Sequence, residues 1–298
     1  MLLNLSMAAG AMGFFGTSAY GQVQTNQPAK KKWTMIVFMN GHSNLAQYTD
    51  KDINEMEAVG SDENRNIVVQ WATESETQTH RMLIKKDADT TTITSPKIES
   101  MPRVDMGDYR ELQRFLEWAI EKYPAEHYFV DVWNHGNGWM ERMPGQAFEV
   151  NNISYDDISG NSISIPDLAL ALKAASEKAG KKIDIYGSDA CLMAMAEVGS
   201  ELAPYVETMV GSEEVEPLDG WEYTTFLNAW NLKPNATSHE IGQILADTYM
   251  ESYATGYRGL TFSVVDLTQM EAFDNAFRDF SSMLTGKSAA EAKSILAA

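Results

Sequence analysis

The single cysteine of this 298-residue chain and one of its five histidines each follow a short apolar segment. Cys191 comes after residues 183–186 and a run of small residues, and His135 comes after residues 128–133. A thiol can act as a nucleophile, and an imidazole can move the proton that such a reaction requires. Residues 192–202 show helical periodicity, and the amides at the start of such a helix would lower the pKa of the thiol. The pattern therefore predicts a Cys/His pair for nucleophilic catalysis.

Each of the two residues also has a purely structural interpretation. A lone cysteine is most often a small buried apolar side chain, and a histidine at a strand end often only hydrogen-bonds the scaffold. Their joint placement favours catalysis, because both follow apolar, strand-like segments and both have small or glycine-rich neighbours.

Apolar segments of strand length alternate with segments of helical periodicity along the chain. Residues 33–40 and 66–73 are nearly continuous apolar runs, as expected for strands covered on both faces. This alternation predicts an α/β fold with a mostly parallel central sheet and helices on both faces. In such folds the active site lies beyond the carboxyl ends of the strands. Residues 91–98 are predicted to be a hairpin strand, and the polar stretch 134–164 is predicted to be a long loop.

The blocks that end in His135-Gly136 and Asp189-Ala190-Cys191 resemble the cysteine-peptidase clan of caspases, legumains, gingipains and clostripain. Within this clan, most of the chain is similar to the clostripain family. The resemblance is carried by WTMIVFMN (33–40), KDINEMEAVGS (51–61), FVDVWNHGNGW (129–139), YDDISGNSISIPDL (155–168), IDIYGSDACLMAMAEV (183–198) and VGSEEVEPLDGW (210–221). It implies a caspase-like three-layer sandwich over residues 33–285 and cleavage of peptides or proteins after Arg or Lys.

The resemblance also implies a role for individual residues. Cys191 would be the nucleophile and His135 the general acid/base, while the N–H groups of Gly136 and Cys191 would form the oxyanion hole. Asp189 and Asp219 would line the S1 pocket, which binds the substrate residue before the cleaved bond (P1), and would pair with its positive charge. Their structural alternatives are a helix N-cap for Asp189 and a turn residue for Asp219.

Two further features follow from the same resemblance. The family commonly cleaves itself in the loop after the histidine block, and Arg142 is the only basic residue in 140–165. It is therefore the candidate self-cleavage site, with an ordinary surface arginine as the alternative. His42 stands where the family typically has an acidic residue, in a loop that the clan places near S1, so it bears on the P1 preference.

Charge and cysteine content exclude several classes of function. The chain has 23 basic and 42 acidic residues, a net charge of −19 at pH 7, which argues against nucleic-acid and anionic-membrane partners. One cysteine cannot form an internal disulfide, and no Cys/His cluster predicts a structural zinc site. No cofactor is expected to be required. Calcium is the one candidate ion, and Asp156-Asp157 or Glu213-Glu214 could bind it, although such acidic pairs are usually just solvated.

The ends of the chain suggest processing and export. Residues 1–21 contain no charged side chain and end in a small-residue motif, which predicts a signal peptide and a secreted or periplasmic protein without a membrane anchor. Residues 22–32 are expected to be a linker, and 286–298 the beginning of a further segment that is truncated here.

Two other functions are weighed against the peptidase. One is a catalytically silent relative that binds peptides or a partner in the same cleft; the retained Cys191 and His135 favour the enzyme over it. The other is a nucleotide-binding protein, for which Gly136-Asn137-Gly138 is only a weak signal because it lacks a third glycine and a following helix. No GxSxG motif of a serine hydrolase occurs.

Overall fold

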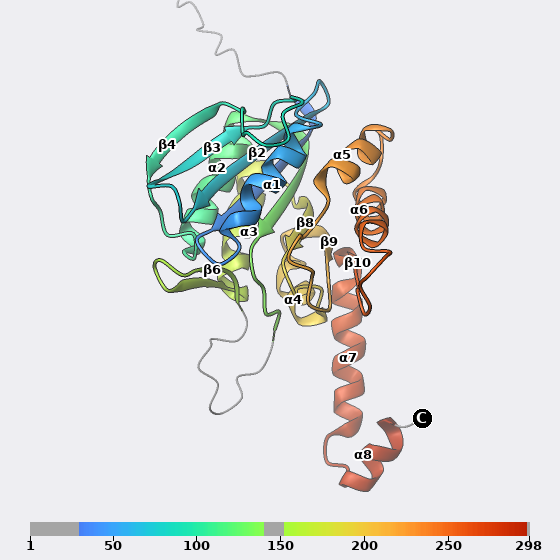
Figure 1. Ribbon diagram of the computed structural model, residues 1–298. Coiled ribbons are helices and arrows are strands. Elements are labelled where there is room, and N and C mark those ends of the chain that lie inside the picture. The colour runs from blue at the N-terminus through green and yellow to red at the C-terminus, as the bar shows by residue number, and fades with distance from the viewer. Residues whose placement is uncertain (1–29, 140–151, 297–298) are drawn as a thin grey trace, which may run out of the picture.

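The computed structural model describes residues 30–139 and 152–296 (Figure 1). The predicted signal peptide, most of the predicted linker and Arg142 lie outside the described residues.

An eight-stranded sheet forms the centre of the protein. Its strands are β1 (Lys31–Gly41), β2 (Arg65–Thr73), β3 (Gln78–Leu83), β4 (Lys97–Pro102), β5 (Ala125–Trp133), β8 (Ile183–Asp189), β9 (Val206–Gly211) and β10 (Ser263–Asp266). They lie in the order β10-β9-β8-β5-β1-β2-β3-β4. The strands from β9 to β2 in this order run parallel, whereas β10 at one edge and β3 and β4 at the other are antiparallel to their neighbours.

Helices cover both faces of this sheet (Figure 1). One face carries α1 (Ala46–Glu57), α5 (Tyr223–Asn231) and α6 (Ser238–Ser252), and the other carries α2 (Tyr109–Lys122), α3 (Ile165–Ala179) and α4 (Ala196–Leu202). Alternate β1 residues enter the two cores: Ile36 and Phe38 belong to one and Met35 and Val37 to the other, all fully buried. Successive side chains of a strand point to opposite faces, so an unbroken apolar run is what this position requires. The three-layer sandwich expected from the sequence is confirmed.

The chain leaves the sandwich after β10. A short 3-10 turn, η1 (Leu267–Gln269), leads into α7 (Met270–Leu284), which extends away from the sheet and is followed by α8 (Ala289–Leu296) (Figure 1). Met270 packs against the core, whereas Phe273, Phe277 and Phe280 are exposed.

Two sequence-based predictions about strands and loops were wrong, and one helix was missed. Residues 91–96 are not a strand and only 97 and 98 belong to one, because the second strand of that hairpin is β4, a half-exposed edge strand without an apolar run. The stretch predicted as one long loop contains a separate hairpin of β6 (Asn152–Asp156) and β7 (Asn161–Ser164). The helix α5 was not predicted at all.

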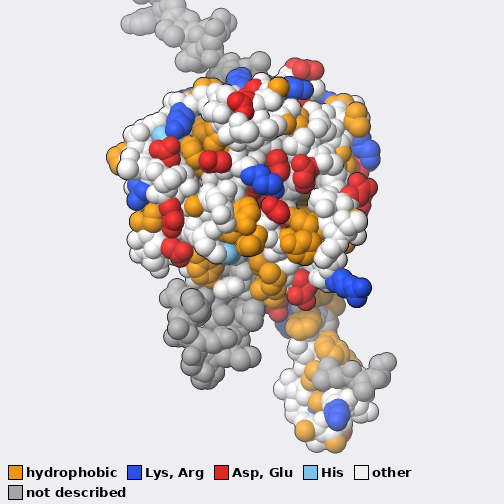
Figure 2. Space-filling view, in the orientation of Figure 1, with side chains coloured by type: hydrophobic (Ala, Val, Ile, Leu, Met, Phe, Trp, Pro, Cys, Tyr) orange, Lys and Arg blue, Asp and Glu red, His pale blue; other side chains and the backbone are white. Residues whose placement is uncertain are grey.

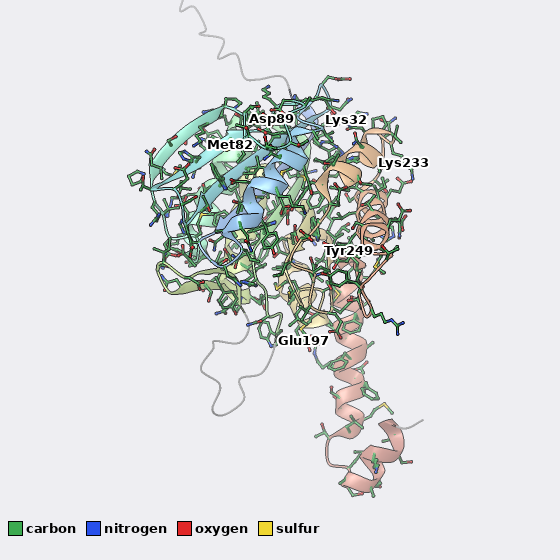
Figure 3. All side chains as sticks on the ribbon, in the orientation of Figure 1. Lys32, Met82, Asp89, Glu197, Lys233 and Tyr249 are labelled. Carbon is green, nitrogen blue, oxygen red and sulfur yellow. The ribbon has the colours of Figure 1, made fainter. Side chains whose placement is uncertain are left out.

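Side chains fill the space between sheet and helices (Figure 3). On the face shown in Figure 2, acidic side chains are spread over the surface and basic ones are scattered singly. Among residues 30–139 and 152–296, no helix has the length and apolar character needed to cross a membrane.

Candidate active site

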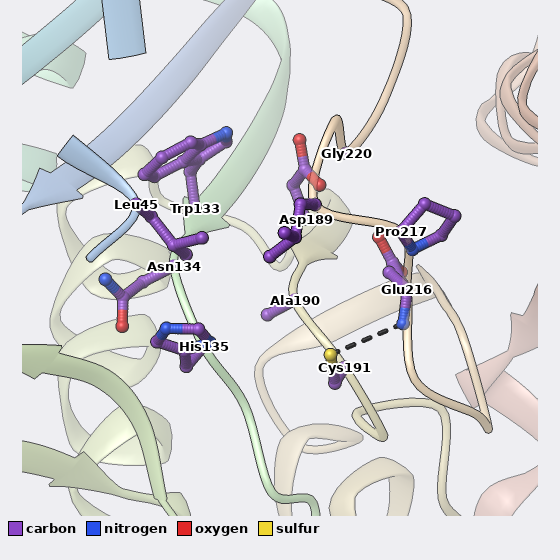
Figure 4. A pocket seen from close by; sticks show the side chains of 11 residues that line it. Leu45, Trp133, Asn134, His135, Asp189, Ala190, Cys191, Glu216, Pro217 and Gly220 are labelled. Carbon is purple, nitrogen blue, oxygen red and sulfur yellow. Dashed lines mark hydrogen bonds between the residues drawn. The ribbon is translucent and has the colours of Figure 1, made fainter. Parts of the chain in front are cut away.

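Two neighbouring parallel strands bring the cysteine and the histidine together. β5 pairs with β8, and the last pair in register is Trp133 with Asp189. His135 and Cys191 each lie two residues beyond this pair, so the spacing between them in the sequence matches the register of the sheet. Both line one pocket, together with Asp189, Glu216 and seven further residues (Figure 4).

The environment of Cys191 differs from the prediction. α4 begins at Ala196, because residues 191–195 form a turn that is hydrogen-bonded to the segment after β9. In this turn the N–H of Leu192 donates to the carbonyl of Glu214 (3.2 Å) and that of Ala194 to Ser212 (3.0 Å). Without a helix N-terminus at the thiol, burial prevails and raises the pKa of Cys191. The expected lowering of this pKa was wrong.

A residue that the sequence analysis did not single out holds the imidazole of His135. The Nε2 atom lies 2.7 Å from Oδ1 of Asn44, in the loop between β1 and α1. When Nε2–H donates to Asn44, Nδ1 carries the lone pair of the neutral ring. Burial lowers the pKa of His135, while the charge of Asp157 opposes this shift. The ring is therefore suited to accept a proton near neutral pH.

Gly136 allows the loop of His135 and the loop of Cys191 to approach each other. A Cβ atom at this position would lie 2.6 Å from the carbonyl oxygen of Cys191 and 2.9 Å from Met193, so only glycine fits. In the described parts of the chain, no backbone acceptor bonds the Gly136 N–H.

Asp189 belongs to a buried acidic network at one end of the pocket. Its Oδ2 accepts a hydrogen bond from the backbone N–H of Trp221 (3.2 Å) and lies 2.9 Å from the Tyr223 hydroxyl. The same hydroxyl lies 2.8 Å from Oδ2 of Asp131, and its single proton cannot serve both carboxylates. Burial raises the pKa of Asp189 to about 7. Burial and the neighbouring Asp189 raise the pKa of Asp131 well above its usual range.

The structure does not bring Asp219 into the pocket. Its side chain is 58% exposed and forms an ion pair with Lys51, whose Nζ lies 3.4 Å from Oδ1. Lys51 also donates to the backbone carbonyl of Asp219 (3.3 Å) and pairs with Glu55 on α1 (3.2 Å).

His42 lies outside this pocket as well. It is 1% exposed, and its Nδ1 lies 2.8 Å from Oδ2 of Asp156. Burial opposes ionisation of Asp156, but hydrogen bonds from His42 and from backbone N–H groups hold its pKa below the usual value. With its oxygens occupied by these donors, Asp156 has little capacity left for calcium. Residues 30–139 and 152–296 contain no cluster of three or more His, Cys, Asp or Glu side chains suited to a metal ion.

A thiol and an imidazole that follow adjacent parallel strands of a three-layer sandwich and line one pocket with two carboxyl groups are the arrangement of a caspase-like cysteine peptidase. The comparison with known proteins agrees with this class. The profile of the clostripain family, peptidase family C11, matches residues 37–296. The chain belongs to this family.

The individual relatives share only 22% sequence identity with this chain. Clostripain of Hathewaya histolytica is 22% identical over 224 residues, which cover 67% of this chain but only 42% of the relative. A secreted C11 cysteine protease of Bacteroides thetaiotaomicron, solved with an irreversible peptide inhibitor, is 22% identical with a TM-score of 0.66 and covers 84% of this chain and 70% of that one. An inactive C11 zymogen of Parabacteroides distasonis, also 22% identical, has a TM-score of 0.62 and covers 82% and 64%. At this identity the solved structures establish the shared fold.

Proposed function

We propose that this protein is an exported cysteine endopeptidase that cleaves peptide bonds after Arg or Lys. The observation that carries the proposal is the pocket itself, where Cys191, His135 and the carboxyl group of Asp189 lie together. Membership of the clostripain family supports the reaction type. Export rests on the sequence of residues 1–21 alone.

The reaction would use the neutral thiol and the neutral imidazole as the resting pair, because burial raises the pKa of Cys191 and lowers that of His135. Nδ1 of His135 would take the thiol proton as the sulfur attacks the carbonyl carbon of the substrate. The N–H groups of Gly136 and Cys191 would stabilise the oxyanion. The imidazolium would then protonate the leaving amine, and water would hydrolyse the thioester.

The S1 carboxyl group supports a basic P1 residue. Asp189 is buried, so a guanidinium or ammonium group that enters the pocket would be held by a charge-assisted hydrogen bond. The uncharged side chains of the same pocket, such as Leu45 and Pro217, would contact the aliphatic part of Arg or Lys.

Matched fluorogenic peptides that end in Arg, Lys, Asp or Asn test this function, with the wild type and Cys191→Ala compared under reducing conditions. We expect the wild type to release the fluorophore from the peptides that end in Arg and Lys. In Cys191→Ala the rate of release should fall at least about 1,000-fold, because the nucleophile is missing. Cleavage after Asp or Asn would retain the mechanism and overturn the S1 assignment. A folded wild type that cleaves none of the peptides would favour the catalytically silent relative.

A further inference from the structure

The pocket contains a second buried carboxyl group. Glu216, in the segment between β9 and α5, is 8% exposed and lines the pocket with Cys191 and Asp189 (Figure 4). Both of its carboxyl oxygens are buried, and no described N–H or hydroxyl group donates a hydrogen bond to either. The partner of the Glu216 side chain is the carboxyl group of Asp189, so the two acids can share a proton. A cationic group that enters the pocket could displace this proton and bind both carboxylates.

The backbone holds Glu216 next to the reaction centre. The backbone N–H of Glu216 donates a hydrogen bond to Sγ of Cys191 (3.3 Å). This bond holds the backbone of Glu216, from which its side chain extends, next to the thiol. Figure 4 shows the side chains of Glu216 and Asp189 on the same side of the pocket, beyond the thiol. A P1 side chain that enters past Cys191 would meet both carboxyl groups.

No cation of the described chain neutralises this pair. Burial raises the pKa of Glu216 well above its usual range, and the charges of Asp189 and Cys191 add to the effect. The ion pairs of the described residues include neither Glu216 nor Asp189. Lys51 forms its ion pairs with Glu55 and with the exposed Asp219. The pair therefore provides two acceptors for a positive charge that the protein itself does not supply.

We infer that Glu216 is the second specificity-determining acid of S1, and that Glu216 and Asp189, not Asp219, bind the charged end of the P1 side chain. This inference rests on the proposed function. A guanidinium group is planar and has five N–H donors, so it can bond both carboxylates at once. Asp219 would have to break its ion pair with Lys51 before it could bind the P1 side chain.

The test compares peptides that are identical except for Arg or citrulline at P1. Citrulline has nearly the shape of Arg but carries a neutral urea group in place of the guanidinium group. In Glu216→Gln the pocket keeps its shape but can no longer form the second carboxylate when a guanidinium group binds, so we expect the ratio of kcat/KM for Arg over citrulline to fall about 10- to 100-fold. Asp219→Asn is expected to keep the ratio within about threefold, as for a surface charge.

Glu214→Gln is the matched control, because Glu214 is an exposed residue of the same segment. A merely structural role of Glu216 would lower hydrolysis of both peptides in parallel and leave the ratio unchanged. An unchanged ratio in Glu216→Gln would overturn the inference. So would a fall in the ratio of kcat/KM for Arg over citrulline in Asp219→Asn.

A binding measurement separates this inference from the proposed function. Calorimetric titration of argininamide is carried out in the Cys191→Ala background, with Glu216→Gln or Asp219→Asn added. We expect the affinity to fall at least about tenfold only with Glu216→Gln. Selective binding together with no peptide cleavage by the wild type would reject the peptidase and retain the S1 assignment, whereas equal binding by both double variants would reject the assignment.

Discussion

At the scale of single residues, Asn44 orients the imidazole of His135. The 2.7 Å contact between Asn44 Oδ1 and Nε2 fixes the ring and its tautomer. In Asn44→Ala the imidazole loses this partner, and we expect kcat to fall about 10- to 100-fold with little change in KM. Steady-state kinetics with an Arg peptide measures both values.

The pH dependence of thiol alkylation provides the control for Asn44. Burial lowers the pKa of His135, so the ring stays neutral to a lower pH than an exposed histidine. Asn44→Asp would place a carboxylate at the same contact and favour the imidazolium. We therefore expect the acid limb of Cys191 alkylation by iodoacetamide to move to higher pH in this variant. Asn44 would have no positioning role if kcat in Asn44→Ala equalled the wild-type value and the acid limb of alkylation in Asn44→Asp stayed at the wild-type pH.

The same residues mark how far a sequence can predict the site. Cys191 and His135 could be found because each directly follows a strand, and the sheet register then brings them together. Asn44 follows β1 and Glu216 follows β9, but both lie in loops whose course depends on tertiary contacts. Glu216 is directed inward by its backbone bond to Cys191, a contact that no local pattern reveals.

At the scale of elements, the end of β8 and the start of α5 form an acidic network that affects stability. The folded protein holds Asp189 at a pKa of about 7 against a usual 3.8, so the native state keeps a proton that the unfolded chain releases. Stability therefore falls as pH rises from about 4 to about 7.

Urea unfolding of the wild type and Asp189→Asn from pH 4 to pH 8 measures this effect. We expect the variant to gain stability relative to the wild type as pH rises, and the difference to level off above about pH 7. Asp247→Asn serves as the control, since Asp247 is exposed on α6. A difference that is independent of pH would contradict the raised pKa.

The elements themselves were predictable to different degrees. The central strands β1, β2, β5 and β8 are buried on both faces, so their apolar runs are visible in the sequence. The edge strand β4 and the hairpin of β6 and β7 lack such runs, because solvent and neighbouring loops cover much of them. For the start of α4, hydrogen bonds to the segment after β9 overrode the local periodicity.

At the scale of the whole molecule, the predicted self-cleavage at Arg142 would divide the sandwich without separating it. The break would fall between β5 and β6 in the chain, yet β5 and β8 are neighbours in the sheet. Each hydrophobic core also takes side chains from both sides of the break, such as Ile53 and Phe226 in one of them. His135 would lie on one fragment and Cys191 on the other, so activity requires that the fragments stay together.

We therefore expect active wild-type protein to show two bands in denaturing gels and one particle, of unchanged mass apart from any released peptide, in native mass spectrometry. Arg142→Ala and Cys191→Ala should each remain a single chain, the first because the P1 residue is missing and the second because the nucleophile is missing. The fragments should separate only when denaturant unfolds the shared sheet, since both cores are buried across the break. A fully active wild type that stays intact would eliminate Arg142 as an activation site, whereas fragments that separate in native buffer would contradict the shared sheet and cores.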